Sequence, residues 1–96
     1  MPRVYLGLGS NIDREKNLRG AVRALEEHFG DVLVSPVYES AAVGFEGDPF
    51  YNLVVAIDTD KTVGELAAEL RAIEETWGRD RRAPRFSSRT LDIDIL

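Results

Sequence analysis

Apolar side chains recur at helical intervals in two parts of the chain. Between Asp13 and Gly30, the residues that share one helical face are Leu18, Ala21, Val22, Leu25 and Phe29. This spacing predicts an amphipathic helix, with Asp13 as its N-cap and Gly30 as its stop. The second stripe consists of Leu66, Leu70, Ile73 and Trp77. Thr62 and Glu65 have the spacing of a capping box before it, and Gly78 follows it, so a second helix is expected there.

Segments rich in β-branched and aromatic residues predict strands. They are 4–8, 32–38, 52–57 and 91–95. Pro36 places the second of them at a sheet edge or at a bulge, because proline cannot donate a hydrogen bond to a neighbouring strand. The small residues of 7–11 are interpreted as a tight turn that leads into the first helix, and 39–49 as a long ligand-facing loop.

The predicted order of elements is β-α-β-β-α-β. This is the ferredoxin-like arrangement of the α+β class, an antiparallel sheet with two helices on one face. The 96 residues suffice for a single domain over 1–96. The chain has no cysteine, which excludes disulfides and thiolate metal sites.

The charge balance limits the classes of partner. Lys and Arg number 12 against 17 Asp and Glu, a net charge of −5, which argues against nucleic-acid coating and against anchoring on anionic lipid. No apolar run approaches the roughly 20 residues of a membrane span, and the chain begins without a signal peptide. We therefore expect a cytoplasmic protein with no nucleic-acid or membrane partner.

Two aspartates alternate with apolar residues in the last strand. Asp92 and Asp94 are expected on one face, about 6.5–7 Å apart between their Cα atoms. Such a carboxylate pair can hold one or two Mg²⁺ ions that keep water and substrate phosphates as their other ligands. The alternative is a solvated sheet face with two ordinary surface charges.

A basic segment precedes these aspartates. Its arginines are Arg79, Arg81, Arg82, Arg85 and Arg89, with Asp80 as the one acid among them. Arginine is a bidentate donor to phosphate oxygens, so together with the acidic pair the segment indicates a polyphosphate substrate and phosphoryl transfer. The alternative is a solubilising loop that pairs with nearby carboxylates.

Aromatic and amide side chains suggest a second ligand. Phe50, Tyr51 and Asn52 offer ring faces beside an amide that both donates and accepts hydrogen bonds, and Phe86 is placed to close from the other side. A flat heterocycle fits this combination. The alternative is that Phe50 and Tyr51 only pack at a strand edge. His28 is interpreted as a partner of the first helix's C-terminal dipole rather than as a catalyst.

The whole chain resembles the 6-hydroxymethyl-7,8-dihydropterin pyrophosphokinases of folate biosynthesis. The matching strings are LGLGSN at 6–11, FYN at 50–52, EE-x-WGR-x-R at 74–81 and, most specifically, RFSSRTLDIDIL at 85–96. The resemblance implies a transferase that moves diphosphate from ATP to the pterin hydroxymethyl group and releases AMP.

The resemblance also implies roles for individual residues. Asp92 and Asp94 would hold two Mg²⁺ ions and, with Arg79 and Arg89, form the catalytic set. The residues it assigns to the pterin are Ser40, Val43, Phe50, Asn52 and Phe86. Those it assigns to the nucleotide are Arg71, Glu74, Arg79, Arg81, Arg85 and Arg89.

The chain departs from the family pattern in three respects. Ser87-Ser88 replaces a frequent Gly-Pro, Ala41-Ala42 stands where prolines are common, and family members continue beyond this length, so the domain is expected to be truncated relative to them. The alternative hypothesis is a noncatalytic binding or assembly module that forms a homo-oligomer through an exposed sheet edge. An RNA-binding module of the same strand order is disfavoured, because Asp92 and Asp94 stand where such modules carry aromatics.

Overall fold

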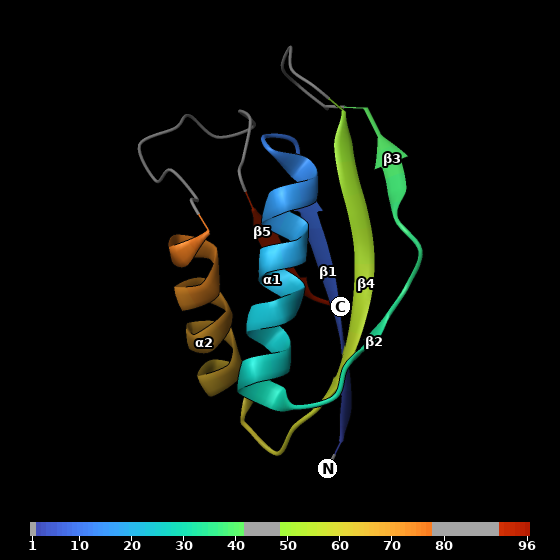
Figure 1. Cartoon of the computed structure of the whole chain (residues 1–96). Coiled ribbons are helices and arrows are strands. Elements are labelled where there is room, and N and C mark those ends of the chain that lie inside the picture. Colours follow the sequence, from blue (N-terminus) through green and yellow to red (C-terminus); the bar gives the residue numbers. More distant parts are fainter. Residues whose placement is uncertain (1, 42–48, 78–90) are drawn as a thin grey trace.

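A computed structural model describes residues 2–41, 49–77 and 91–96 (Figure 1). Its elements are β1 (Arg3–Ser10), α1 (Arg14–Phe29), β2 (Leu33–Val34), β3 (Tyr38–Ser40), β4 (Phe50–Asp58), α2 (Val63–Thr76) and β5 (Asp92–Ile95). The sheet is antiparallel throughout, in the order β2-β4-β1-β5, and β3 also pairs with β4. This confirms the predicted ferredoxin-like α+β arrangement.

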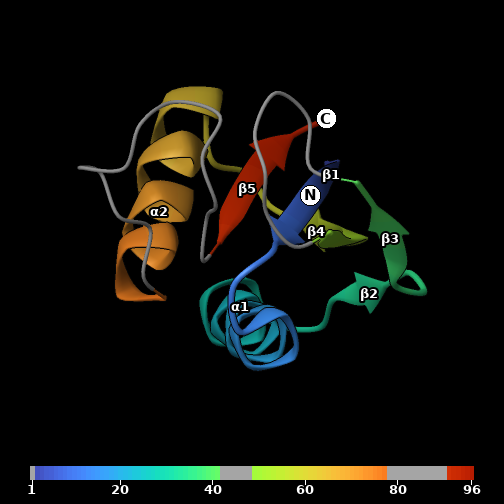
Figure 2. The ribbon, with the colours of Figure 1, turned by 90° about the horizontal axis from the view of Figure 1, so that it is seen from above.

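Both helices cover the same face of the sheet (Figures 1 and 2). The apolar stripes of the helices meet alternate residues of the central strands in one core, because a strand turns every second side chain to the same face. The core residues are Leu6, Leu8, Leu18, Ala21, Leu25, Leu53, Val55, Ile57, Leu66, Leu70, Ile73, Leu91 and Ile93. Neither helix of the described segments is long and apolar enough to cross a membrane.

The turn before α1 differs in detail from the prediction. Asp13 is the N-cap residue, but its backbone is left-handed (φ 45°) and its side chain caps no helix amide. The turn is held instead through the carbonyl of Ile12, which accepts hydrogen bonds from Asn17 Nδ2 at 2.7 Å and Ser10 Oγ at 3.0 Å. At the other end, Gly30 terminates α1 as expected with φ 82°, a conformation that glycine adopts without strain.

The edge strand is broken, whereas a single strand over 32–38 was predicted. The register with β4 pairs Val34 with Val55 before the break and Tyr38 with Asn52 after it, so the bulged strand gains one residue. The Pro36 position explains this, since proline cannot donate to the ladder. Ser35 partly bridges the gap, because its Oγ accepts a hydrogen bond from Val54 N at 2.8 Å.

The capping box of α2 is confirmed. Thr62 Oγ1 accepts from Glu65 N at 3.2 Å, and Glu65 Oε1 accepts from Thr62 N at 2.9 Å. At its other end the helix finishes at Thr76, with Trp77 as C-cap. The predicted stop at Gly78 lies outside the described residues.

The helices touch closely where Trp77 crosses α1. A Cβ added to Gly20 would lie well inside contact distance of the Trp77 ring, so only a glycine permits this approach. Trp77 therefore fixes the C-terminal turn of α2 against α1.

A second contact between the helices is polar and joins the last turn of α1 to the middle of α2. His28 Nδ1 lies 2.6 Å from Glu69 Oε1, and Lys61 Nζ lies 3.3 Å from Glu69 Oε2. Burial disfavours the charged form of Glu69, but the hydrogen bonds from His28 and Lys61 outweigh it and hold the pKa of this carboxyl below its ordinary value. His28 thus links α1 to α2 rather than only capping a helix.

We expect Gly20→Ala to destabilise the fold by about 1–3 kcal/mol, because the new methyl group forces the Trp77 ring out of place. Urea unfolding would measure the change, and the fluorescence of Trp77, the chain's one tryptophan, would report the displacement. Gly64→Ala is the matched control. Its Cβ meets nothing within 4 Å, so it should stabilise α2 by up to about 1 kcal/mol. Equal effects of the two variants would contradict the close packing.

The Glu69 contact predicts a pH-dependent contribution to stability. Since the folded-state pKa is lowered, the contribution is complete above the ordinary value of 4.5 and disappears as the pH falls through the folded-state pKa. Glu69→Gln should cost about 1 kcal/mol at pH 7, and much less at about pH 3. Urea unfolding at both pH values would measure this, with Glu27→Gln, an exposed glutamate of α1, as the charge control. A pH-independent difference would contradict the assignment.

Candidate functional site

The register of β1 with β5 places glycines opposite the two aspartates. Gly9 pairs with Asp92 and Gly7 pairs with Asp94. All four residues therefore belong to the face of the sheet away from the helices, called the far face below. The strand predicted over 4–8 extends to Ser10, so the prediction that the chain turns from Gly9 onward is wrong for Gly9 and Ser10, which lie within β1. Gly7 is half-buried and Gly9 is buried, because the side chain of Leu96 lies beside Gly7 and other side chains lie beside Gly9. Glycines at alternate positions of a strand mark close approach of neighbouring groups, and this pattern was the signal available in the sequence.

The far face also carries the predicted amide. Asn52 lies opposite Gly9 on the other side of β1, so Asn52, Gly9 and Asp92 form one row across three strands. Neighbouring strands are about 4.8 Å apart, which puts Asn52 about 10 Å from Asp92 along this row. Asn52, which is predicted to bind a heterocycle, and Asp92, which is predicted to bind a metal, therefore lie on opposite sides of Gly9.

Asn52 is oriented by its neighbours. Its Nδ2 donates to Ser40 Oγ at 2.7 Å, which brings together two of the residues predicted to bind the pterin. A Cβ at Gly9 would lie 3.1 Å from Asn52 Oδ1 and 3.6 Å from Phe50 Cδ1. The absence of a side chain at Gly9 therefore leaves space for the Asn52 amide and the Phe50 ring. Ser40, Phe50 and Asn52 lie together at the start of β4.

A hollow of about 350 Å³ lies between α2 and the outer edge of β5. Its lining includes Arg71 and Glu74 from α2 together with Asp92 and Asp94 from β5. The structure thus brings both described residues of the predicted nucleotide set next to the predicted metal pair. Arg71 is exposed, whereas Glu74 is only 4% exposed, and its Oε2 accepts a hydrogen bond from Ile93 N at 2.9 Å.

The donor chemistry of this corner suits a hard cation. Asp94 is exposed and Asp92 half-buried, on the same face of one strand. In the described segments no group of three or more His, Cys, Asp or Glu side chains gathers in a way that could hold a metal. Two carboxylates fit Mg²⁺, which keeps water and substrate oxygens as its remaining ligands. The residues therefore fit a cation that arrives with a phosphate, and the number of ions stays a prediction.

Several predicted residues lie outside the described residues. They are Val43, Arg79, Arg81, Arg85, Phe86 and Arg89. Their proposed roles stay predictions.

Arg14 is a contributing residue that the sequence did not indicate. Its guanidinium lies 3.9 Å from the centre of the Tyr51 ring, and its Nη1 donates to Pro49 O at 2.9 Å. These contacts tie the start of α1 to the start of β4, directly before Phe50 and Asn52. No periodicity distinguishes Arg14 from other exposed arginines, so sequence reasoning could not select it.

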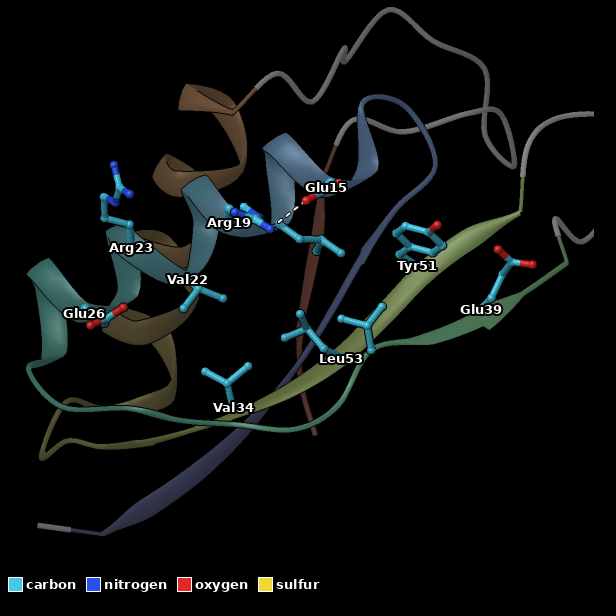
Figure 3. Close-up of a pocket in the computed structure, with 11 residues that line it drawn as sticks. Glu15, Arg19, Val22, Arg23, Glu26, Val34, Glu39, Tyr51 and Leu53 are labelled. Carbon is cyan, nitrogen blue, oxygen red and sulfur yellow. Dashed lines mark ion pairs between the residues drawn. The ribbon is translucent and has the colours of Figure 1, made fainter.

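A wider groove of about 770 Å³ lies on the helix side of the sheet (Figure 3). It is bounded by α1 and the edge of the sheet, with Val22, Val34 and Leu53 along its floor and the Arg19–Glu15 ion pair at its rim. Tyr51, one of the aromatic residues expected to meet a heterocycle, lines this groove on the helix side, whereas no other described residue of the predicted sites does. The groove is therefore separate from the site at the edge of β5.

Comparisons with known proteins identify the family of the chain. Residues 5–96 match the family model described as 7,8-dihydro-6-hydroxymethylpterin-pyrophosphokinase (HPPK). The chain is 41% identical over 98 residues to the 2-amino-4-hydroxy-6-hydroxymethyldihydropteridine pyrophosphokinase of Aquifex aeolicus, covering 100% of this chain and 61% of that protein. It is 42% identical over 98 residues to the enzyme of that name from Pseudomonas putida, covering 98% of this chain and 80% of that protein.

A third relative extends the comparison to another group of bacteria. The pyrophosphokinase of the same name from Porphyromonas gingivalis is 38% identical over 101 residues, covering 100% of this chain and 69% of the relative. The chain thus spans 61–80% of the length of these relatives.

Proposed function

Because the chain belongs to the 7,8-dihydro-6-hydroxymethylpterin-pyrophosphokinase family, we propose that it transfers the terminal diphosphate of ATP to 6-hydroxymethyl-7,8-dihydropterin and releases AMP. The observation that carries the proposal is the row of Asn52, Gly9 and Asp92 across the far face. An amide that suits the edge of a heterocycle and a carboxylate that suits a metal thus lie on either side of a glycine. We place the reaction in the cytoplasm, as a step of folate biosynthesis.

The pterin is proposed to lie over the Gly9 position. Asn52 would hydrogen-bond the edge of the ring, with Ser40 holding the amide in place, and Phe50 would contact the ring system. Val43 and Phe86 complete the proposed pterin contacts. This pose directs the hydroxymethyl group toward Asp92 and Asp94.

The nucleotide is proposed to enter from the hollow between α2 and β5. Arg71 and Glu74 would face it there, while Arg79, Arg81, Arg85 and Arg89 supply positive charge to its phosphates. Asp92 and Asp94 would hold Mg²⁺, which when bound neutralises phosphate charge and orients the diphosphate. Two ions are expected.

The reaction itself needs positioning more than covalent participation by the protein. The pterin hydroxyl oxygen forms a bond to the β-phosphorus of ATP while the bond from that phosphorus to the oxygen shared with the α-phosphate breaks. AMP leaves with that oxygen, and the hydroxyl proton passes to solvent. The contribution of the residues of this chain is to hold the two substrates in line and to stabilise the developing charge.

The test is release of AMP from ATP in the presence of Mg²⁺ and 6-hydroxymethyl-7,8-dihydropterin. We expect turnover by the 96-residue chain, and a loss of about 100-fold or more when Asp92 and Asp94 are both changed to Ala. Asp31→Ala, which removes an exposed aspartate far from these residues in the sequence, is the control. Release of ADP would indicate simple hydrolysis and not diphosphate transfer.

A different outcome would favour the other hypothesis. If the chain binds ATP and the pterin but releases no AMP, a noncatalytic binding or assembly module is the better description. Light scattering would then test whether such a module self-associates through a sheet edge.

Gly9→Ala should weaken pterin binding selectively. Its methyl group would displace the Asn52 amide and thus cost about one hydrogen bond, or about tenfold in affinity. ATP binding should be unchanged, because Gly9 lies on the far side of β5 from the hollow with Arg71. Calorimetric titration of both ligands would measure this, with Gly64→Ala as the control. Equal weakening of both ligands would show that the variant acts on the fold and not on Asn52.

A further inference from the structure

Glu74 is the one charged side chain among the buried polar residues that the described segments contain. The others are Ser10, Asn11, Asn17 and Thr59. A carboxylate removed from water costs free energy unless hydrogen bonds compensate it, so a buried glutamate needs a specific partner. Part of that compensation comes from the backbone of β5, through the 2.9 Å hydrogen bond from Ile93 N to Glu74 Oε2.

The position of this bond is specific. Residues of an antiparallel strand alternate between facing the neighbouring strand and facing away from it. Leu96 N donates to Tyr5 O at 2.9 Å, which shows that the even-numbered residues of β5 bond to β1. The amide of Ile93 therefore points to the outer edge of the sheet. In the described part of the sheet β5 is the edge strand, and there Glu74 accepts the hydrogen bond of the residue between Asp92 and Asp94.

We propose that Glu74 is a positioning residue that fixes β5 so that the Asp92 and Asp94 carboxylates address the same cation. The proposal rests on the proposed function, in which these two aspartates bind Mg²⁺. It differs from the role of nucleotide contact that the family resemblance implies for Glu74. Without the bond, the outer edge of β5 loses its hydrogen bond to α2 at Ile93, and the relative position of the two carboxylates is less well defined.

The support behind Glu74 is itself rigid. One turn further along α2, Trp77 packs against Gly20 of α1, so the turn that carries Glu74 is fixed to the helix layer. Through the hydrogen bond to Ile93, Glu74 in turn fixes β5 relative to the helices. The proposed role acts through the backbone of β5, because Glu74 Oε2 accepts the hydrogen bond from Ile93 N.

The experiment uses Mn²⁺ as a paramagnetic substitute for Mg²⁺ and follows backbone amides by NMR. In the unaltered chain we expect Mn²⁺ to broaden the amides of Asp92 and Asp94, and the Ile93 amide to be protected from hydrogen exchange by about 100-fold. Glu74→Leu, which has no acceptor, should remove this protection and weaken Mn²⁺ binding by about 10- to 100-fold. Glu74→Gln keeps an acceptor oxygen and should retain both properties. Glu75→Leu, at the exposed neighbouring position, is the control.

The outcomes separate the two proposals. Absence of broadening at Asp92 and Asp94 in the unaltered chain would overturn the metal pair, and the role of Glu74 with it. Mn²⁺ binding of ordinary strength in a folded Glu74→Leu would overturn the role of Glu74 alone. Equal weakening in Glu74→Gln and Glu74→Leu would also overturn it, since it would assign the effect to charge. If Glu74→Leu does not fold, two other measurements decide. Loss of Mn²⁺ binding in Glu74→Gln would overturn the proposal, and so would an Ile93 amide that exchanges freely in the unaltered chain.

Discussion

The antiparallel register between β1 and β5 is the constraint on which the candidate site depends. A strand alternates its side chains with a period of two, so a slip of one residue moves every side chain to the opposite face. In the observed register Leu8 and Ile93 enter the core while Gly9 and Asp92 share the far face. A one-residue slip would bury the aspartates and expose the core residues. The burial of apolar side chains therefore also fixes where the carboxylates lie.

The same constraint explains why much of the fold could be predicted. Several predicted features depend only on residues two to four apart in the sequence. They are the helical stripes, the capping box of Thr62 and Glu65, and the alternation in β5, and the structure confirms each of them. The break at Pro36 and the unusual cap at Asp13 depend on how the chain meets β4 and Asn17. The pairing with β4 joins segments far apart in the sequence, so the break was predicted only as an edge or bulge. The contact of Asn17 with Ile12 is local but follows no standard capping pattern, so Asp13 was predicted as an ordinary cap.

The candidate site divides in the same way. Asp92, Asp94 and Asn52 could be selected because their chemistry is unusual for a strand. Gly9 was marked only by the alternation of glycines and was interpreted as part of a turn, because its contribution is the space it leaves for Asn52. Arg14 could not be selected, since its contribution is a contact with Tyr51. Glu74 was selected for a contact with ligand, yet its burial shows a carboxylate engaged with backbone. Family resemblance identifies that a position matters, whereas burial and hydrogen bonding indicate how it acts.

A site on an edge strand faces two opposing demands. Its outer edge must stay accessible for a ligand to approach from the side of α2, but an unpaired edge also invites pairing with another chain. The buried carboxylate of Glu74 accepts the hydrogen bond of the outward-pointing Ile93 amide. This amide is thus not available to another chain, and no further strand covers the edge at that position in the described sheet. The aspartates on either side keep their carboxylates on the far face, where the residues of β1 paired with them are glycines. The hydrogen bond at the outer edge and the pairing with β1 at the inner edge thus hold β5 from both sides while Asp92 and Asp94 stay on the far face.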